Sequence, residues 1–197
     1  MRAHSTDTGR RFRSEAGYTL VELLMVVAIV AILGGMVAAV TMNYVNRAKA
    51  DGAALSVIST LEVARTRAIS ERRNFEVTFQ LPNRIIVQRV NVANGIISGR
   101  TPVIDVLLEN GLIFKKFSSL PDTPDTFGAA TEIDFDGTGP IAFTSDGSLI
   151  DQAGDPSNAT VFFGEDSIDS ATARAITIMG ATGLIKSFVW GKTQWIG

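Results

Sequence analysis

An uncharged apolar run from Leu23 to Val40 constrains this chain more than any other feature of its sequence. Its 18 residues approach the roughly 20 that a helix needs to cross the hydrocarbon core of a bilayer. In residues 1–17, four arginines against two acids give a net charge of +2, and basic flanks tend to stay on the cytoplasmic side. We therefore expect a retained membrane helix; a secretory signal cleaved after Ala39 is the alternative.

Glu22 stands at the head of this apolar run. A carboxylate inside a bilayer is costly and usually has a cationic partner. Cleavage between Gly17 and Tyr18 would create such a cation, because the new α-amino group would lie four residues away, about one helical turn. Glu22 could pair with this group in its own chain or in a neighbouring copy of a helix bundle. The alternative is that Glu22 is an ordinary interfacial residue.

The composition excludes several kinds of catalytic and metal site. The chain has no cysteine, so it has no disulfide, thiol nucleophile or cysteine metal ligand. Its single histidine is His4, so no Ser–His pair and no histidine metal site is expected downstream. Residues 51–197 carry 12 Lys and Arg against 17 Asp and Glu, a net charge of −5, which argues against broad nucleic-acid binding.

Helical periodicity continues beyond the apolar run. We expect one helix from about Tyr18 to Arg72, in which residues 18–40 form the membrane part and residues 41–73 an amphipathic half that packs one face on a domain. The residues expected on that face recur at three- and four-residue spacing: Ala50, Ala53, Ala54, Val57, Ile58, Leu61, Ala64, Ala68 and Ile69.

Gly34 and Gly35 lie within the apolar part of the predicted helix. Each glycine weakens a helix by about 1 kcal/mol relative to alanine. Two interpretations remain open. The pair allows close packing between helices in a membrane, or it gives the helix a flexible point.

After Arg73 the apolar period changes from helical to two, so residues 74–197 are expected to form an antiparallel β domain. Phe75, Val77 and Phe79 should share one face of the first strand. Long loops are expected at 118–131 and 151–159. The fold class predicted is α+β, a long N-terminal helix packed on an antiparallel β-sheet domain. The strands are expected at 74–81, 84–90, 103–108, 112–117, 132–136, 140–144, 160–164, 174–179 and 184–190.

The stretch GYTLVELL, residues 17–24, resembles the class III signal of type IV pilins and type II secretion pseudopilins. The resemblance implies that residues 1–17 are a leader, that a prepilin peptidase cuts after Gly17 and N-methylates Tyr18, and that Glu22 is required for assembly. Tyr18 departs from the usual Phe but keeps the aromatic ring. Ala16 stands where a basic residue is common, which puts the efficiency of cleavage in question.

Three further stretches, residues 61–79, 141–151 and 173–190, are similar to the GspH/FimT family of that superfamily. This resemblance implies a pilin-like fold and a minor pseudopilin of the type II secretion pseudopilus. Its partners would be other pseudopilins or pilins, an inner-membrane assembly platform and that platform's ATPase. The leader would be cytoplasmic and residues 74–197 periplasmic. The alternatives are a FimT-like type IV minor pilin in pilus assembly, adhesion or DNA uptake, and a membrane-anchored periplasmic binding domain.

Two further motifs are candidates for ligand binding. Asp134 and Asp136 are spaced like the start of a calcium loop, but the twelfth position is Ser145 where a Glu is needed. Because turn chemistry explains them equally, we expect no metal or cofactor and keep both as weak candidates.

Some FimT-type pilins bind DNA through a Gly-Arg-x-Arg motif. Here Leu184 and Lys186 replace its two arginines, which argues against DNA.

Four arginines lie close together near the end of the predicted helix, at 65, 67, 72 and 73. Cations suit a helix C-terminus, and we expect these side chains to be solvated. No cluster of acidic residues suggests acid–base catalysis. The sequence therefore predicts a structural subunit and no enzyme.

Overall fold

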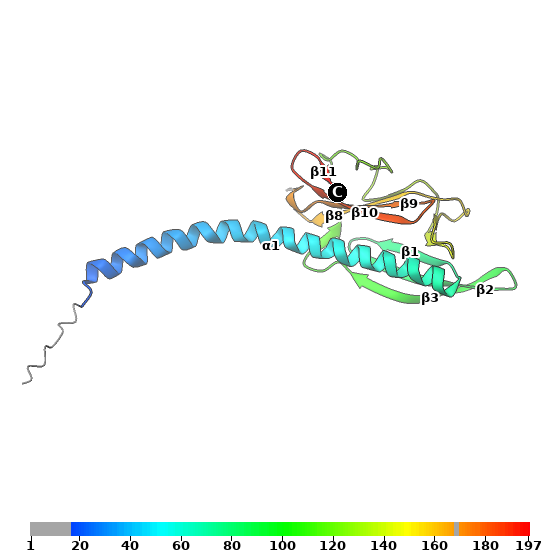
Figure 1. Ribbon diagram of the computed structural model, residues 1–197, viewed down its shortest axis with the longest axis horizontal. Helices are drawn as coiled ribbons and strands as arrows, with labels where there is room; N and C mark the ends of the chain where they lie inside the picture. The colour runs from blue at the N-terminus through cyan, green and yellow to red at the C-terminus, as the bar shows by residue number, and fades with distance from the viewer. Residues whose placement is uncertain (1–16, 168–169) are drawn as a thin grey trace, which may run out of the picture. The chain divides into compact units, whose positions relative to one another are not determined.

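The computed structural model describes residues 17–167 and 170–197, except for the side chains of residues 38–40 and 43. The chain divides into two compact units, Met1–Asn43 and Tyr44–Gly197, and a single helix, α1 (Leu20–Glu71), contributes to both. Figure 1 shows α1 and the strands of the second unit. The predicted helix is confirmed, with bounds two residues inside the expected start and one inside the expected end.

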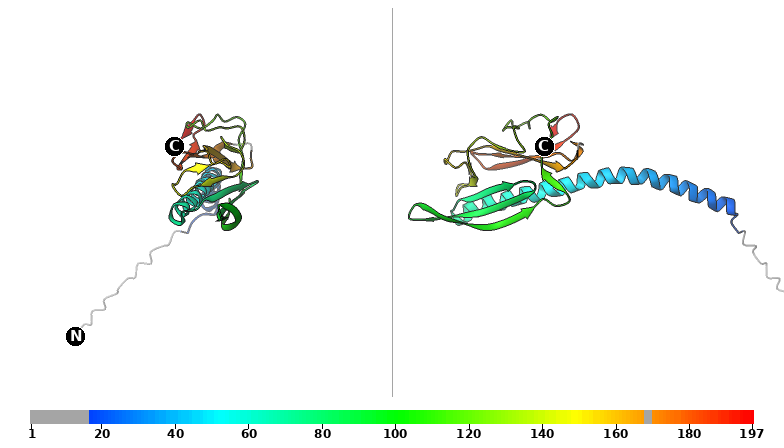
Figure 2. Two further views of the ribbon diagram at one scale, coloured as in Figure 1. Left: turned by 90° about the vertical axis from the view of Figure 1, so that its right-hand side faces the viewer. Right: turned by 180° about the vertical axis from the view of Figure 1, so that it is seen from behind.

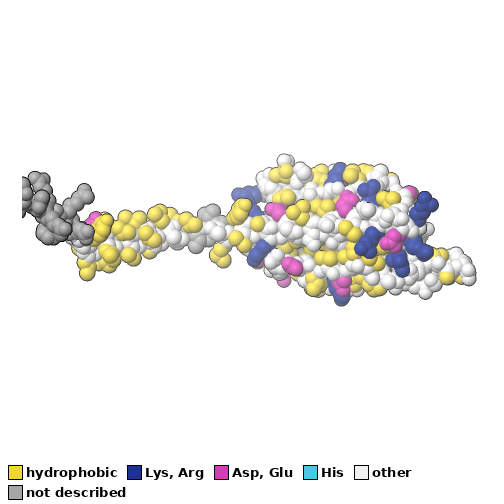
Figure 3. Space-filling model, turned by 60° about the horizontal axis from the view of Figure 1, so that its bottom comes forward, with side chains coloured by type: hydrophobic (Ala, Val, Ile, Leu, Met, Phe, Trp, Pro, Cys, Tyr) yellow, Lys and Arg dark blue, Asp and Glu magenta, His cyan; other side chains and the backbone are white. Residues whose placement is uncertain are grey.

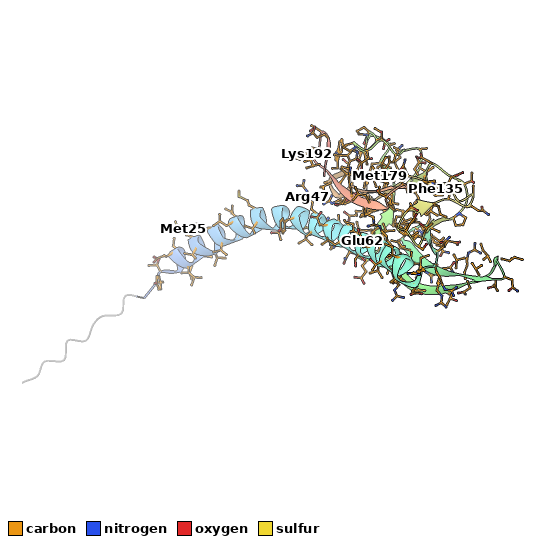
Figure 4. The ribbon with its side chains drawn as sticks, turned by 45° about the vertical axis from the view of Figure 1, so that its right-hand side comes forward. Met25, Arg47, Glu62, Phe135, Met179 and Lys192 are labelled. Carbon is orange, nitrogen blue, oxygen red and sulfur yellow. The ribbon has the colours of Figure 1, made fainter. Side chains whose placement is uncertain are left out.

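The first unit presents the apolar part of α1. Leu20–Val37 is long and apolar enough to cross a membrane, and none of it is buried within the described part of the chain. Met25 illustrates this exposure, since its side chain stands clear of all but its helical neighbours (Figure 4). Among the described residues of this unit, nothing covers the apolar surface of α1.

In the second unit, one face of α1 is buried as the periodicity predicted. Val57, Leu61 and Ala64 have no exposed surface. The assignment of Ile69 to this face is wrong, because its side chain is 45% exposed. The buried stripe instead ends at Ala68, because α1 ends at Glu71 and Arg72 takes a left-handed conformation (φ 51°) that turns the chain toward the first strand.

The strands form two antiparallel sheets. The five-stranded sheet has the order β3-β2-β1-β6-β7. Its strands are β1 (Phe75–Gln80), β2 (Arg84–Ala93), β3 (Ile96–Leu107), β6 (Ile141–Phe143) and β7 (Leu149–Ile150). The six-stranded sheet has the order β11-β10-β9-β8-β4, with β5 also paired to β8. Its strands are β4 (Leu112–Phe114), β5 (Ile133–Phe135), β8 (Ala159–Glu165), β9 (Arg174–Met179), β10 (Leu184–Trp190) and β11 (Trp195–Ile196).

Most predicted strands are present, but three were misjudged. The strand expected at 103–108 is the end of a longer strand, β3, which pairs with β2 through the turn at Asn94-Gly95. Both turn residues have positive φ, 54° and 78°, as Asn-Gly favours in a two-residue hairpin. This dipeptide is a readable signal of the hairpin, and the prediction missed it. The short strands β7 and β11 were also missed, because two residues are too few to show alternation.

The helix and both sheets share one hydrophobic core. Phe75 and Val77 of the five-stranded sheet and Phe163 of the six-stranded sheet meet the buried face of α1. Figure 2 shows β1–β3 and β8–β10 as separate layers in its end-on view. Phe79 packs against the same core, so the predicted common face of the first strand is confirmed. The α+β class, with a long helix packed on antiparallel strands, is confirmed as well.

The six-stranded sheet is covered on its other face by the loop predicted at 118–131. Phe117 and Leu120 pack with Phe162, Phe188 and other side chains in a second cluster. Trp195 Nε1 donates a hydrogen bond to the carbonyl of Pro121 at 2.9 Å. The predicted loop is therefore confirmed, and it forms part of the folded domain.

Candidate functional site at the helix N-terminus

Thr19 caps the N-terminus of α1. The Glu22 backbone N–H donates to Thr19 Oγ1 at 3.3 Å, and the Leu23 N–H donates to the Thr19 carbonyl at 3.2 Å. Thr-Leu-Val-Glu has the spacing of a capping box, in which a Thr is followed three residues later by Glu. Thr19 was not among the predicted site residues, although the sequence alone carries this signal. Thr19 thereby fixes where the helix begins.

Glu22 lies in the first turn of α1, and its side chain is exposed. The partial positive charge of a helix N-terminus favours an acid at this position. Within residues 17–167 and 170–197, no cation lies within ion-pair distance of its carboxylate. The pairing of Glu22 with a terminal amino group stays a prediction, and the structure leaves its carboxylate open to a partner.

Gly17 and Tyr18 precede the helix. Both are exposed and outside regular secondary structure, and Tyr18 is 86% exposed. Exposed non-helical segments are where proteases cut most readily. The bond between the two residues is therefore accessible for the predicted cleavage. The rest of the predicted leader, residues 1–16, lies outside the described residues.

Gly34 and Gly35 lie within the continuous helix. A Cβ atom added at either glycine would meet nothing within 4 Å beyond its own stretch of helix, so nothing in the described part of the chain requires a glycine there. Both interpretations, close packing against a neighbouring helix and a flexible point, stay predictions.

Asp134 and Asp136 hold loops together. Asp134 accepts a hydrogen bond from the Ala130 N–H, and Asp136 accepts one from Asn158 Nδ2 at 2.9 Å. Among the described residues, no group of three or more His, Cys, Asp or Glu side chains is placed to hold a metal ion. The two carboxylates therefore have structural partners of their own.

Arg65 differs from the solvated side chain that was expected. Its Nε donates to the Gly147 carbonyl at 3.1 Å, and its Nη2 donates to the Thr182 carbonyl at 2.9 Å. It thus joins the turns that follow β6 and β9 to the helix. The prediction of a solvated helix end is wrong for Arg65, because two turns distant in sequence fold against this face of α1.

Lys186, the cation at the position of the DNA-binding motif, is engaged within the chain. Its Nζ lies 2.7 Å from Asp125 Oδ1, and Thr177 Oγ1 donates to Asp125 Oδ2 at 2.7 Å. Although burial raises the pKa of Asp125, the hydrogen bonds from Lys186 and Thr177 leave that pKa below its ordinary value. The carboxylate is therefore charged at neutral pH and offsets the lysine.

Arg174 is a buried cation that the sequence analysis did not single out. Its side chain is 3% exposed, and its Nη2 lies 2.7 Å from Asp51 Oδ1 on α1. Its Nη1 donates to the Ala173 carbonyl at 2.9 Å. A buried charge is tolerated only when it is paired and hydrogen-bonded. Arg174 meets this condition and ties β9 to the helix.

Comparison with known proteins gave one family and a set of solved structures. Residues 12–38 match the family described as "Prokaryotic N-terminal methylation motif". No curated protein gave a match. The chain is similar to the minor pseudopilin EpsH from the type 2 secretion system of Vibrio cholerae, with 15% identity, coverage of 73% of this chain and 99% of that one, and a TM-score of 0.49. It is also similar to the type IV minor pilin FimU of Pseudomonas aeruginosa, with 16% identity, coverage of 78% and 96%, and a TM-score of 0.49.

The matched motif contains Gly17, Tyr18 and Glu22 together with the start of the apolar helix. The N-terminal methylation motif expected from the sequence is therefore confirmed.

Proposed function

We propose that this chain, which carries an N-terminal methylation motif on a membrane-length helix, is a minor pseudopilin. It would serve as a structural subunit of the type II secretion pseudopilus and take part in protein secretion, with no catalytic role. Gly17 would be the cleavage residue, Tyr18 the N-methylated residue and Glu22 the residue that directs assembly.

The observation that carries this proposal is the arrangement at the start of α1. An accessible Gly17–Tyr18 bond precedes the helix, Glu22 occupies the first turn, and the apolar surface that follows has no cover among the described residues. A lone anchor would need the apolar surface but neither the cleavable bond nor the acid. A subunit that bundles through its helix needs all three, because the acid of one helix can meet the new amino group of another.

The location and partners follow from this arrangement. The basic leader would remain in the cytoplasm, α1 would cross the inner membrane, and the β domain would face the periplasm. Its partners would be a prepilin peptidase, other pseudopilins or pilins through helix bundling, and the assembly platform with its ATPase. A membrane-anchored periplasmic binding domain is the alternative of another class.

The paired state of Lys186 supports a secretion role over DNA uptake. A DNA-binding surface uses cations that can exchange counterions for phosphates. Lys186 has Asp125 at 2.7 Å, and its neighbour Leu184 carries no charge. We therefore rank nucleic acid low among the partners. A type IV minor pilin in assembly or adhesion remains the nearest alternative function.

The experiment is co-expression of the full chain with a prepilin peptidase. We expect the product to lose residues 1–17 and to carry one methyl group on the amino group of Tyr18, read by intact and tryptic mass spectrometry. A Gly17→Val variant should stay unprocessed, because a branched side chain replaces hydrogen at the bond to be cut. An unshortened wild-type product would remove the pseudopilin proposal and favour the anchored binding domain.

A second experiment separates secretion from pilus assembly. Deletion of the gene should reduce protein secretion while pili remain. Loss of pili with normal secretion would instead assign the chain to a pilus.

A further inference from the structure

The β2–β3 hairpin extends beyond the sheet that supports it. The last pair between β1 and β2 joins Phe75 and Arg89, whereas β2 and β3 continue to pair as far as Ala93 and Ile96. Residues 91–99, here called the finger, therefore pair only with each other. Figure 1 shows this hairpin running past the end of β1.

The finger exposes apolar side chains on both of its faces. Val92 lies opposite Ile97, and Ala93 lies opposite Ile96, so the two pairs alternate between the faces of the ribbon. Val92, Ile96 and Ile97 are 51%, 72% and 56% exposed. An isolated two-stranded ribbon is marginal in water unless another surface packs on it. These side chains therefore indicate a contact outside the chain.

Arginines stand at the base of the finger. Arg89 and Arg100 are paired with Glu71 and Glu76. Arg72 and Arg73 are exposed, and neither makes an ion pair with any residue the structure describes. Figure 3 shows dark-blue side chains gathered at this end of the second unit. An acceptor of the finger should therefore offer an apolar recess with a carboxylate at its edge.

The opposite end of the same sheet carries such a recess. A groove of about 280 Å³ lies between α1 and the end of β3, lined among others by Gly52, Ser56, Leu107, Glu109 and Asn110. Leu107 is 55% exposed, and the nearby Leu55 on α1 is 68% exposed. Glu109 is exposed and has no ion-pair partner in the described ranges. Arg84, at the outer edge, is neutralised by Asp105.

The two surfaces cannot meet within one chain. Ile96 and Leu107 begin and end β3, which places them roughly 36 Å apart at about 3.3 Å per residue. They can meet only between copies, finger of one into groove of the next. Such a head-to-tail contact uses two different patches and produces an open filament when the rotation between copies does not close.

We infer that the finger of one copy docks in the groove of a second copy, with Arg72 or Arg73 facing Glu109. The inference rests on the proposed assembly function and adds to it a contact between β domains. Lys49 lies one turn before the groove on α1 and offsets the charge of Glu109 in the net charge of that end. The attraction for Arg72 or Arg73 therefore depends on the position of Glu109 itself. Because each chain carries both the finger and the groove, two copies can occupy consecutive positions along the filament.

Cysteine cross-linking tests the contact cleanly, because the natural chain has no cysteine. The full chain carrying Ile96→Cys and Ser56→Cys is expressed in bacterial membranes together with the other pseudopilins and treated with a short bismaleimide. We expect a ladder of covalent oligomers, since each copy links to two others. Either single variant should yield nothing larger than a dimer. The matched control, Ile96→Cys with Thr193→Cys, keeps the finger cysteine and places the second at another exposed position, where no ladder is expected.

Charge exchange sharpens the test. Glu109→Arg should reduce the ladder severalfold by repelling Arg72 and Arg73, and Arg73→Glu in the same chain should restore part of it. Glu132→Arg, which changes the same charge away from the groove, should leave it unchanged. A ladder no stronger than that of the Thr193 control, or one insensitive to Glu109→Arg, would overturn the inference.

A separate reporter distinguishes failure of this contact from failure of assembly. Met25→Cys lies on the exposed apolar helix and should cross-link between bundled helices (Figure 4). Cross-linking at Met25 without a finger ladder leaves the proposed function standing and overturns only the finger contact. Loss of both overturns the proposed function. Two outcomes would identify a different occupant of the contact and overturn the inference that the finger binds a second copy. The first is cross-linking of Ile96→Cys to a sister subunit. The second is a blue shift, in the presence of anionic vesicles, in the emission of a fluorophore attached to the thiol of Ile96→Cys.

Discussion

The two parts of α1 are continuous in one helix and have opposite surroundings. From Leu20 to Val37 every described side chain is exposed, whereas from Ala50 to Ala68 one face is buried against two sheets. Leu24 and Leu61 show the contrast, being 58% and 0% exposed. The second part finds its packing partners within the chain. The first part has no packing partner among the described residues, and under the proposed function it would find one in lipid or in other helices.

The charges on and around the helix repeat this contrast. Arg174 is buried and satisfied by Asp51 and by backbone carbonyls of the same chain. Glu22 lies in an apolar surface and has no cationic partner among the described residues. A charge that is paired within its own chain, like that of Arg174, has a structural role. An unpaired charge in an apolar, membrane-length segment, like that of Glu22, indicates a partner in another molecule.

The largest expected effect is the loss of assembly in Glu22→Gln. Removing the charge removes the attraction to the amino group of a neighbouring Tyr18, while the amide keeps the size and the helical position. We expect incorporation into sheared filaments to fall to background, measured by immunoblotting against total membrane protein.

The matched control is Glu62→Gln, an acid on the same helix in the second unit. It should incorporate like the natural chain. Normal incorporation of Glu22→Gln would mean that Glu22 is an ordinary interfacial residue and would remove the contrast drawn between the two charges.

The next effect compares the same residue type in the two parts of the helix. Leu61→Ala should lower the free energy of unfolding of the second unit by about 2–5 kcal/mol, because it leaves a cavity between α1 and both sheets. Leu24→Ala should leave that unfolding unchanged, because Leu24 touches no part of the core. Denaturant unfolding in detergent, followed by tryptophan fluorescence, measures both. Equal losses would show that the two parts of α1 fold as one cooperative unit.

The smallest effect concerns acid stability of the turn after β6. Hydrogen bonds from Thr144 and Ser148 lower the pKa of Asp146 from its ordinary 3.8 to about 2. A depressed folded-state pKa stabilises the fold above the ordinary value, and the contribution is lost as the pH falls from about 4 to about 2. Asp146→Asn should therefore lower the thermal midpoint at pH 5 and lose less between pH 4 and pH 2. Parallel midpoint curves for the two proteins would contradict this assignment.

Local patterns predicted the elements well where one element's own period controlled the outcome. The helix and the strands β9 and β10 lie at or near their expected positions, because their apolar residues repeat at 3.6 or at two. Asn94-Gly95 shows that a readable turn signal can be missed when the residues beside it, Val92-Ala93 and Ile96-Ile97, do not alternate between apolar and polar. Ile69 followed the helical period and is nevertheless exposed, since the period does not say where the covering sheet ends.

At the candidate site, the sequence alone determined nearly everything: the Gly17–Tyr18 bond, the Thr19 cap, Glu22 and the apolar run are consecutive, so their arrangement follows from local helix geometry. The tertiary structure decided what depends on residues far apart in the chain. It alone showed that Arg65 joins two turns, that Arg174 is buried against Asp51, that Lys186 is neutralised by Asp125, and that a finger and a groove lie at opposite ends of one sheet. The physical reason is that contacts within one turn of helix are fixed by the backbone, whereas contacts between distant segments depend on how the whole core packs.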